Sequence, residues 1–238
     1  MRLHEAGPGV STYKATGIIL RRHDYGEADR IYTILTPERK VSAIAKGIRR
    51  RTAKLASHLE LFHEIELMLI PGKSLDIVTS ARTLAAYSIA EDYERLRRGF
   101  LFLEMVDRLS DTEGTEAVYA VLGSAIAQLS QLPVSICELG FKLQLLDALG
   151  QAPDLSRPEP LPESLGLDIE QGVLSAADNP LAAPLTQDAI KLWRLSLMRP
   201  LGDLARIQGA EVLAMATLPV LDQFIRQQFG IRFNSAEI

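Results

Sequence analysis

The chain has 238 residues, of which 47% are hydrophobic and 24% are charged, a composition typical of a globular protein with a substantial core. Its first residues contain no apolar stretch of signal-peptide length, and no later stretch approaches the roughly 20 apolar residues of a membrane span. We therefore expect a cytoplasmic protein without a membrane partner. Because Cys137 is the only cysteine, an intrachain disulfide and a cysteine-rich zinc site are both excluded.

The net charge of −4 is divided unevenly along the chain. Up to Arg82 the sequence holds fourteen Lys and Arg residues against nine Asp and Glu residues, a net charge of +5, so the remainder carries −9. A basic first third predicts contact with a polyanion, whereas the acidic remainder predicts contact with a different partner.

Residues 12–83 show short runs rich in β-branched and aromatic residues, separated by turn residues, which favours a small all-β unit. We expect five strands, at residues 16–22, 30–36, 40–46, 59–69 and 75–83. Five short antiparallel strands with a long loop after the third are compatible with an OB-type barrel, although periodicity does not separate this fold from an SH3-like barrel. Residues 1–83 are thus predicted to form a small β-barrel domain.

Residues 84–238 are expected to form an α-helical domain, because a helical period replaces the strand pattern after Arg82. Helices are predicted at residues 91–109, 116–132, 134–149, 186–198 and 209–229. Ser135 and Glu138 have the spacing of a capping box, and Thr186 is a candidate N-cap. The proline-rich residues 151–184 lack a sustained period and are expected to be an irregular connector. The predicted fold class is therefore α+β.

The loop at residues 46–54 is the strongest functional candidate, since it carries five cations and no acid. Guanidinium and ammonium groups on a flexible loop neutralise backbone phosphates without reading base sequence. The alternative is an ordinary solvated loop, but four further cations in or beside the β unit could extend the patch. The candidate DNA-binding residues are Arg21, Arg22, Arg39, Lys40, Lys46, Arg49, Arg50, Arg51 and Lys54.

Aromatic residues of the β unit are candidates for stacking on unpaired bases. Tyr25 and Tyr32 are the principal candidates, and Phe62 is a third. Each of these rings would more often belong to the barrel core.

Motifs for catalysis or cofactor binding are missing where they would be easy to recognise. The sequence has no Walker-type phosphate loop and no dinucleotide-binding glycine motif, so no cofactor is expected. His58, Glu60, His63 and Glu64 lie close together in the sequence, but alternate strand positions would divide them between two faces, so no metal is expected.

Two other sets of reactive residue types favour structural roles. Cys137 is expected to be a small buried side chain in a helix rather than a nucleophile. Glu91, Asp92 and Glu94 suit the first turn of a helix better than metal-assisted cleavage.

Three segments near the start of the chain resemble the bacterial RecO family in order and spacing. They are Thr-Gly-Ile-Ile-Leu-Arg-Arg-His-Asp-Tyr-Gly-Glu-Ala-Asp-Arg at residues 16–30, Leu-Thr-Pro-Glu at residues 35–38 and Ala-Lys-Gly-Ile-Arg-Arg at residues 45–50. Residues 59–62, 141–153 and 184–186 are also similar to family segments. The resemblance is specific up to about Leu55 and looser but colinear through most of the remainder.

The resemblance implies an OB-fold that binds single-stranded and double-stranded DNA without sequence preference, followed by a helical domain. It implies a bacterial protein, nucleoid-associated during repair, that anneals complementary strands and acts with RecR. The helical part would bind the acidic tail of the single-stranded-DNA-binding protein, so that RecA can replace that protein on DNA. The cations that match family positions are Arg21, Arg22, Lys46, Arg49 and Arg50, and Arg51 and Lys54 join them on charge alone.

The sequence departs from the family pattern in two places. Many members carry a four-cysteine zinc module after the helix that here ends at Gly150, and this chain has no cysteine in that interval. Residues 231–236 are also less basic than the usual family ending.

We therefore expect a non-enzymatic DNA repair and recombination mediator. An alternative is a protein-interaction adaptor whose acidic helical part binds partners and whose barrel contacts nucleic acid only incidentally. A nuclease without a recognisable motif is a third hypothesis, and charge alone leaves RNA binding open.

Overall fold

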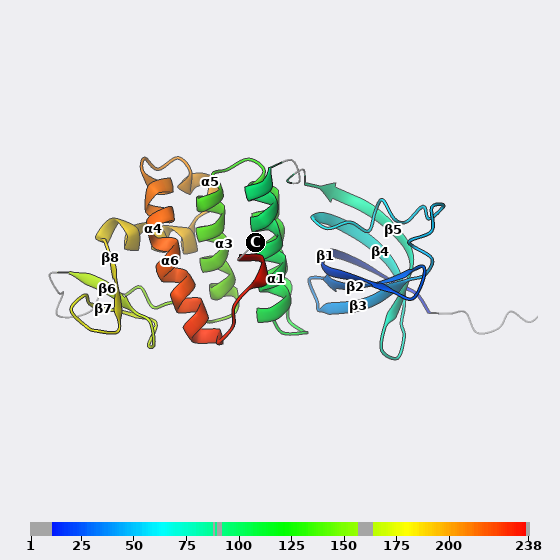
Figure 1. Cartoon of the computed structure of the whole chain (residues 1–238), viewed down its shortest axis with the longest axis horizontal. Helices are drawn as coiled ribbons and strands as arrows, with labels where there is room; N and C mark the ends of the chain where they lie inside the picture. Colours follow the sequence, from blue (N-terminus) through cyan, green and yellow to red (C-terminus); the bar gives the residue numbers. More distant parts are fainter. Residues whose placement is uncertain (1–10, 88, 90–91, 157–163, 237–238) are drawn as a thin grey trace, which may run out of the picture. The chain divides into compact units, whose positions relative to one another are not determined.

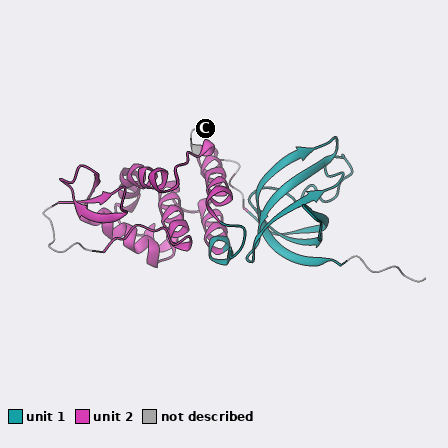
Figure 2. Cartoon of the chain, turned by 90° about the horizontal axis from the view of Figure 1, so that it is seen from below, with its two compact units in different colours: residues 1–86, 111–119 teal, residues 87–110, 120–238 magenta. Residues whose placement is uncertain are grey.

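The computed structural model describes residues 11–87, 89, 92–156 and 164–236. The chain divides into two compact units (Figure 2). The barrel unit comprises Met1–Ala86 and Asp111–Tyr119, and the helical unit comprises Tyr87–Ser110 and Ala120–Ile238. Strands form the first unit and helices dominate the second (Figure 1), so the predicted α+β class is confirmed.

The barrel unit is a closed barrel of five strands in the order β1-β2-β3-β5-β4. Its strands are β1 (Tyr13–Tyr25), β2 (Asp29–Leu35), β3 (Lys40–Ala45), β4 (His63–Ile70) and β5 (Asp76–Ala86). β3 and β5 pair in parallel and the other neighbours are antiparallel, while the long β1 pairs with both β2 and β4. This barrel fits the predicted OB-type fold.

A tight contact where β1 passes from β4 to β2 explains a glycine in that strand. A Cβ at Gly17 would lie 2.6 Å from the Ile34 Cγ2 atom and 2.8 Å from the Leu35 carbonyl oxygen. Alternation places Tyr32 and Ile34 of β2 in the barrel core. Glycine at residue 17 thus allows the backbone of β1 to approach β2 closely at this point.

The fourth strand is shorter than the sequence pattern predicted. Residues 59–62 form a turn before β4, and Phe62 has a φ of 62°, in the left-handed region. Because a strand cannot continue through that conformation, β4 begins only at His63. The Phe62 side chain is 6% exposed, so the prediction that it stacks on a base is wrong in this fold.

The barrel unit also includes a segment from far along the chain. The Lys40 N–H donates to the Thr112 carbonyl at 2.7 Å, and the Gly114 N–H donates to the Glu38 carbonyl at 3.1 Å. The buried Thr115 hydroxyl donates to the Thr36 carbonyl. The boundary expected at residue 83 is therefore corrected: β5 continues to Ala86, and residues 111–119 belong with the barrel.

The helical unit is built around a largely buried helix, α3. The helices of the chain are α1 (Tyr93–Leu109), α2 (Glu116–Leu129), α3 (Val134–Ala148), α4 (Gln187–Met198), α5 (Leu201–Leu204) and α6 (Ala210–Phe229). α3 packs against α1, α4, α5 and α6, and the rings of Phe102 and Phe141 stack with centroids 4.0 Å apart. None of the helices in the described part of the chain is long and apolar enough to cross a membrane.

Helix starts agree only partly with the sequence signals. Thr186 accepts a hydrogen bond from the Ala189 N–H, which confirms it as the N-cap of α4. Asp92 caps α1 in the same way, whereas Glu91 lies outside the described residues. α3 begins after Pro133, as predicted, but the expected capping box is wrong, because Pro133 is the N-cap, no side chain caps the helix and Ser135 lies in its first turn.

The predicted irregular connector contains a small sheet instead. β6 (Leu165–Asp168), β7 (Val173–Ala176) and β8 (Ala182–Leu185) form an antiparallel sheet in the order β7-β6-β8. The buried Asp168 carboxylate accepts hydrogen bonds from the Glu170 and Gln171 N–H groups. Strands of four residues are too short to show a sequence period, and Pro184 is tolerated because β8 is an edge strand. Residues 157–163 of the connector lie outside the described residues.

Candidate nucleic-acid interface

Residues 46–54, the basic loop, are folded against the turn between β1 and β2. The Gly47 N–H donates to the Asp29 Oδ1 atom at 2.7 Å, and the Arg49 N–H donates to the Ala28 carbonyl at 2.9 Å. Between them, Ile48 is only 4% exposed and packs in the barrel core. The start of the basic loop is therefore anchored on both sides of a buried residue.

Successive turns keep the rest of the basic loop compact. Gly47 adopts a φ of 65°, which glycine tolerates without strain, and the Arg50 N–H donates back to its carbonyl at 3.1 Å. The Ala53 N–H then donates to the Arg50 carbonyl at 3.0 Å. The sequence had suggested a flexible loop, and the structure corrects this expectation because both ends of the first turn are hydrogen-bonded.

The basic loop presents most of its cations to solvent. Lys46, Arg50, Arg51 and Lys54 are all exposed. Within the described residues, these four side chains form no ion pair, so their charges are available to an anionic ligand. Phosphate groups are the natural partners of such charges.

Arg49 is held differently, by an acid of the neighbouring strand. Its Nε atom lies 3.3 Å from the Asp24 Oδ2 atom, and the Arg30 Nε atom donates to Asp24 Oδ1 at 2.8 Å. The hydrogen bond from Arg30, supported by the charge of Arg49, lowers the pKa of Asp24 below its ordinary value. One carboxylate thus compensates part of the charge of two guanidinium groups.

The two tyrosines predicted to stack on bases occupy different environments. Tyr25, at the end of β1, is 56% exposed and lies beside the anchored turn. Tyr32 is fully buried within the barrel core, and burial raises the pKa of its hydroxyl. The prediction that Tyr32 stacks on a base is therefore corrected: its ring faces the core and offers no surface to a ligand.

The predicted cations of the barrel do not form one patch. Arg21 is exposed on β1 opposite Thr33, whereas Arg22 is half-buried and paired with Glu60. Lys40 pairs with Leu35 at the far end of β2 and β3, five residue steps from Ala45. Five steps of an extended strand span about 17 Å. Lys40 and its neighbour Arg39 therefore lie at the opposite end of the hairpin from the basic loop.

Arg39 takes part in a local network at its own end of the barrel. Its Nη2 atom lies 3.4 Å from the Tyr13 hydroxyl and 3.8 Å from the Asp76 carboxylate. Tyr13 also donates to Asp76, and burial together with that hydrogen bond raises the pKa of Tyr13 to about 12. Arg39 thus has acidic and phenolic partners within the barrel, unlike the exposed cations of the basic loop.

Two acids, Asp24 and Asp29, contact the basic loop, and sequence reasoning missed both. Charge counting treated both as opposing a polyanion. Their positions on either side of the turn at Gly26 were the available signal, because a short acid next to a turn often accepts backbone hydrogen bonds, as Asp29 does. Arg49, the partner of Asp24, is 25 residues away, and Gly47, the partner of Asp29, is 18 residues away, so no local pattern predicted those contacts.

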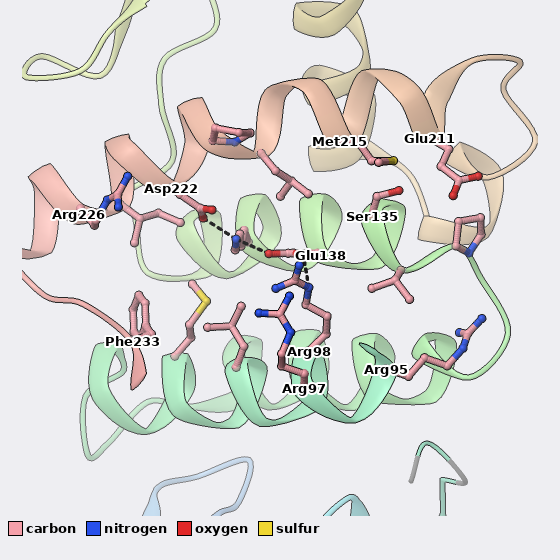
Figure 3. A pocket seen from close by; sticks show the side chains of 18 of the residues that line it. Arg95, Arg97, Arg98, Ser135, Glu138, Glu211, Met215, Asp222, Arg226 and Phe233 are labelled. Carbon is pink, nitrogen blue, oxygen red and sulfur yellow. Dashed lines mark hydrogen bonds and ion pairs between the residues drawn. The ribbon is translucent and has the colours of Figure 1, made fainter. Parts of the chain in front are cut away.

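The helical unit contains a cavity of about 880 Å³ lined by α1, α3, α6 and the segment after α6 (Figure 3). Its apolar lining includes Leu101, Met105, Leu218, Ile225 and Phe233. Five arginines also line it, namely Arg95, Arg97, Arg98, Arg226 and Arg232. Three of these arginines, Arg95, Arg97 and Arg98, pair with acids of the helical unit. The lining also includes three acids, Glu138, Glu211 and Asp222. Since six cations face three acids, an apolar ligand with an anionic group suits the cavity.

A buried ion-pair network crosses one wall of this cavity (Figure 3). The Lys142 Nζ atom is 2.6 Å from Glu138 Oε1 and 2.5 Å from Asp222 Oδ1. The Arg98 Nε atom lies 2.7 Å from Glu138 Oε2. Since each buried charge has an opposite partner, this network supports the wall of the cavity.

Other candidate reactive groups have structural positions. Among the described residues, no three His, Cys, Asp or Glu side chains are grouped to hold a metal ion. His58 lies in the turn before β4, with Nδ1 3.0 Å from the Thr83 hydroxyl oxygen. Cys137 is buried as predicted, and burial raises the pKa of its thiol to about 12, so it is not a reactive thiolate.

A closed five-stranded barrel with an anchored basic loop, followed by a helical region, defines the class of α+β proteins built on an OB-type barrel. Residues 10–87 match the family model described as Recombination protein O N terminal, and residues 90–237 match Recombination protein O C terminal. The chain belongs to the RecO family.

Its relatives are bacterial. The chain is 38% identical over 146 residues to the DNA repair protein RecO of Roseiflexus sp. (strain RS-1), covering 60% of this chain and 52% of the relative. Identity to the DNA repair protein RecO of Heliobacterium modesticaldum is also 38% over 146 residues, covering 60% and 54%. The DNA repair protein RecO of Cutibacterium acnes is 35% identical to the chain over 157 residues, which cover 61% of this chain and 64% of the relative. The chain thus spans about half the length of the first two relatives.

Proposed function

We propose that this chain is a DNA repair and recombination mediator that binds single-stranded DNA through the basic loop. The observation that carries the proposal is the set of four exposed cations that the loop presents, anchored on a barrel of OB type. Phosphate neutralisation by Lys and Arg gives affinity without sequence preference. Names of the relatives support the role in DNA repair.

Single-stranded DNA fits this site better than a duplex does. Tyr25 is exposed close to the anchored turn, where an unpaired base could stack on its ring while phosphates contact the basic loop. Two unpaired strands held through their backbones keep their base edges available for pairing. Strand annealing would follow from such binding without any catalytic group, which agrees with a non-enzymatic role.

The cavity of the helical unit is the proposed partner site. Its arginines and apolar floor suit an acidic peptide segment with a bulky apolar side chain. Resemblance to the RecO family indicates the tail of the single-stranded-DNA-binding protein as that segment. The same resemblance indicates cooperation with RecR in loading RecA onto DNA.

A protein-interaction adaptor is the second candidate, and the same cavity favours it. In that case partner binding would survive loss of the basic loop, and DNA binding would be weak and independent of residues 46–54. The two candidates therefore differ in what charge reversal in the loop does to DNA binding.

Fluorescence anisotropy of a labelled single-stranded oligonucleotide tests the proposal. The variant R50E/R51E/K54E reverses three exposed loop charges and leaves Arg49 with its Asp24 partner. The control K191E/R199E/R206E reverses three exposed charges of the helical unit. We expect the loop variant to lose at least tenfold in affinity and the control to stay close to wild type. Equal affinities for both variants would favour the adaptor.

A further inference from the structure

Asp29, an acid, lies against the basic loop at the start of β2. Its Oδ1 atom accepts the Gly47 N–H at 2.7 Å. One residue before it, Ala28 accepts the Arg49 N–H through its carbonyl. The two bonds flank the buried Ile48, so a short stretch of the β1–β2 turn fixes the backbone from which the exposed cations project.

We propose that Asp29 is a positioning residue for DNA binding, whose side-chain oxygen raises the affinity of the basic loop for a polyanion although its charge opposes one. This inference rests on the proposed function and deepens it. It assigns a favourable role in DNA binding to an acid that a charge count would treat as unfavourable.

The physical reason is preorganisation. A loop that becomes ordered only on binding loses conformational entropy at that moment, and the loss subtracts from affinity. Gly47 has no side chain to restrict its backbone, so the hydrogen bond to Asp29 supplies the restraint that the sequence there lacks. With the bond in place, Lys46 and Arg50 on either side start from fixed backbone positions.

Electrostatics alone predicts that Asp29 lowers the affinity of the basic loop for DNA. Removing a carboxylate beside a phosphate-binding loop would raise the net positive charge and tighten binding. The Asp29 side chain has a negative charge and a hydrogen-bond acceptor oxygen, and substitutions can change these two properties separately. Asp29→Asn removes the charge and keeps an acceptor oxygen, whereas Asp29→Ala removes both. Asp29→Glu keeps the charge and displaces the acceptor by one methylene.

The test measures the affinity of these variants for a labelled single-stranded oligonucleotide by anisotropy at two salt concentrations. We expect Asp29→Ala to bind several-fold more weakly than wild type and Asp29→Asn to bind at least as tightly as wild type. Asp29→Glu should also weaken binding despite its unchanged charge. If Asp29→Ala does not fold, the Asn and Glu variants still decide, because they differ from wild type in charge and in acceptor position respectively.

Hydrogen–deuterium exchange supplies a readout that a general loss of stability would not reproduce. Faster exchange at Gly47 and Arg49 in Asp29→Ala, with wild-type exchange in the β4 and β5 strands, is the expected pattern. Equal affinity of Asp29→Ala and Asp29→Asn would overturn the inference. If wild type binds the oligonucleotide and R50E/R51E/K54E does not, the proposed function stands whatever the Asp29 variants show. If wild type does not bind the oligonucleotide, the proposed function itself is wrong.

Discussion

The Arg49 guanidinium lies 3.3 Å from the Asp24 carboxylate, although 25 residues separate them. Arg49 also points toward the Gly26 carbonyl, at 3.4 Å. These contacts join the basic loop to the last residues of β1. The cations of the loop therefore have two tasks: Arg49 helps hold the loop on the barrel, and Lys46, Arg50, Arg51 and Lys54 face solvent.

Replacing Tyr25 tests the proposed stacking of a base. We expect Tyr25→Ala to reduce the binding free energy for single-stranded DNA by about 1–3 kcal/mol, because one base loses its aromatic partner. Tyr25→Phe keeps the ring and should bind close to wild type. The matched control is Tyr93→Ala, which removes an exposed tyrosine of the helical unit. Anisotropy titrations in which Tyr25→Ala and Tyr93→Ala behave alike would contradict stacking at Tyr25.

The buried Lys142 provides a test of the helical unit. Lys142→Met removes one of the two cationic partners of the Glu138 carboxylate, whose side chain is 5% exposed, and leaves Arg98 as the other. The free energy of unfolding should therefore fall by about 1–3 kcal/mol. Urea denaturation measures this change. Lys191→Met is the control, since its 60% exposed ammonium pairs with Asp188 on the surface and should contribute less than about 1 kcal/mol. Equal losses in the two variants would show that the buried network is not stabilising.

The segment after α6 should detach from α1 in acid. The Glu104 carboxylate accepts hydrogen bonds from the Asn234 and Ser235 N–H groups at 3.0 and 2.8 Å. Burial alone would raise the pKa of Glu104, but these bonds and Arg108 outweigh it and lower that pKa below 4.5. A lowered folded-state pKa means that the stabilisation is complete above the unfolded value and is lost as pH falls through the folded value.

Deuterium exchange of the Asn234 and Ser235 amides, corrected for the intrinsic effect of pH, measures this detachment. In wild type, protection of these amides from exchange should persist at pH 6 and should decrease when the pH is below 4.5. In Glu104→Ala these amides should be unprotected at both pH values. Protection that is unchanged in Glu104→Ala would show that the carboxylate does not hold the segment.

Local chemistry accounts for what the sequence predicted correctly. Thr186 caps α4 through a contact three residues away, and the alternation in β2 needs only neighbouring residues. The same alternation could not decide which face of β2 is the inner one, and Tyr32 was misjudged for this reason. Its pairing with Ala43 of β3 and Arg22 of β1 sets that face, and pairing depends on the closed barrel.

Long-range contacts account for the rest. Thr115 joins the barrel by donating to Thr36, 79 residues earlier, so no linear boundary separates the units. The β6–β8 sheet depends on Asp168 and on strands too short for a visible period. The basic loop itself was evident from its composition, whereas the acids that hold it were not, because a charge count does not distinguish an opposing charge from a hydrogen-bond acceptor.

The most direct test of the central claim, that the basic loop contacts DNA phosphates, is the salt dependence of single-stranded DNA binding. The slope of log K against log salt should be strongly negative for wild type. For R50Q/R51Q/K54Q it should be smaller in magnitude by about 2, since each lost phosphate contact on a single strand changes the slope by about 0.7. A slope unchanged from wild type in this variant would show that these three cations do not contact DNA.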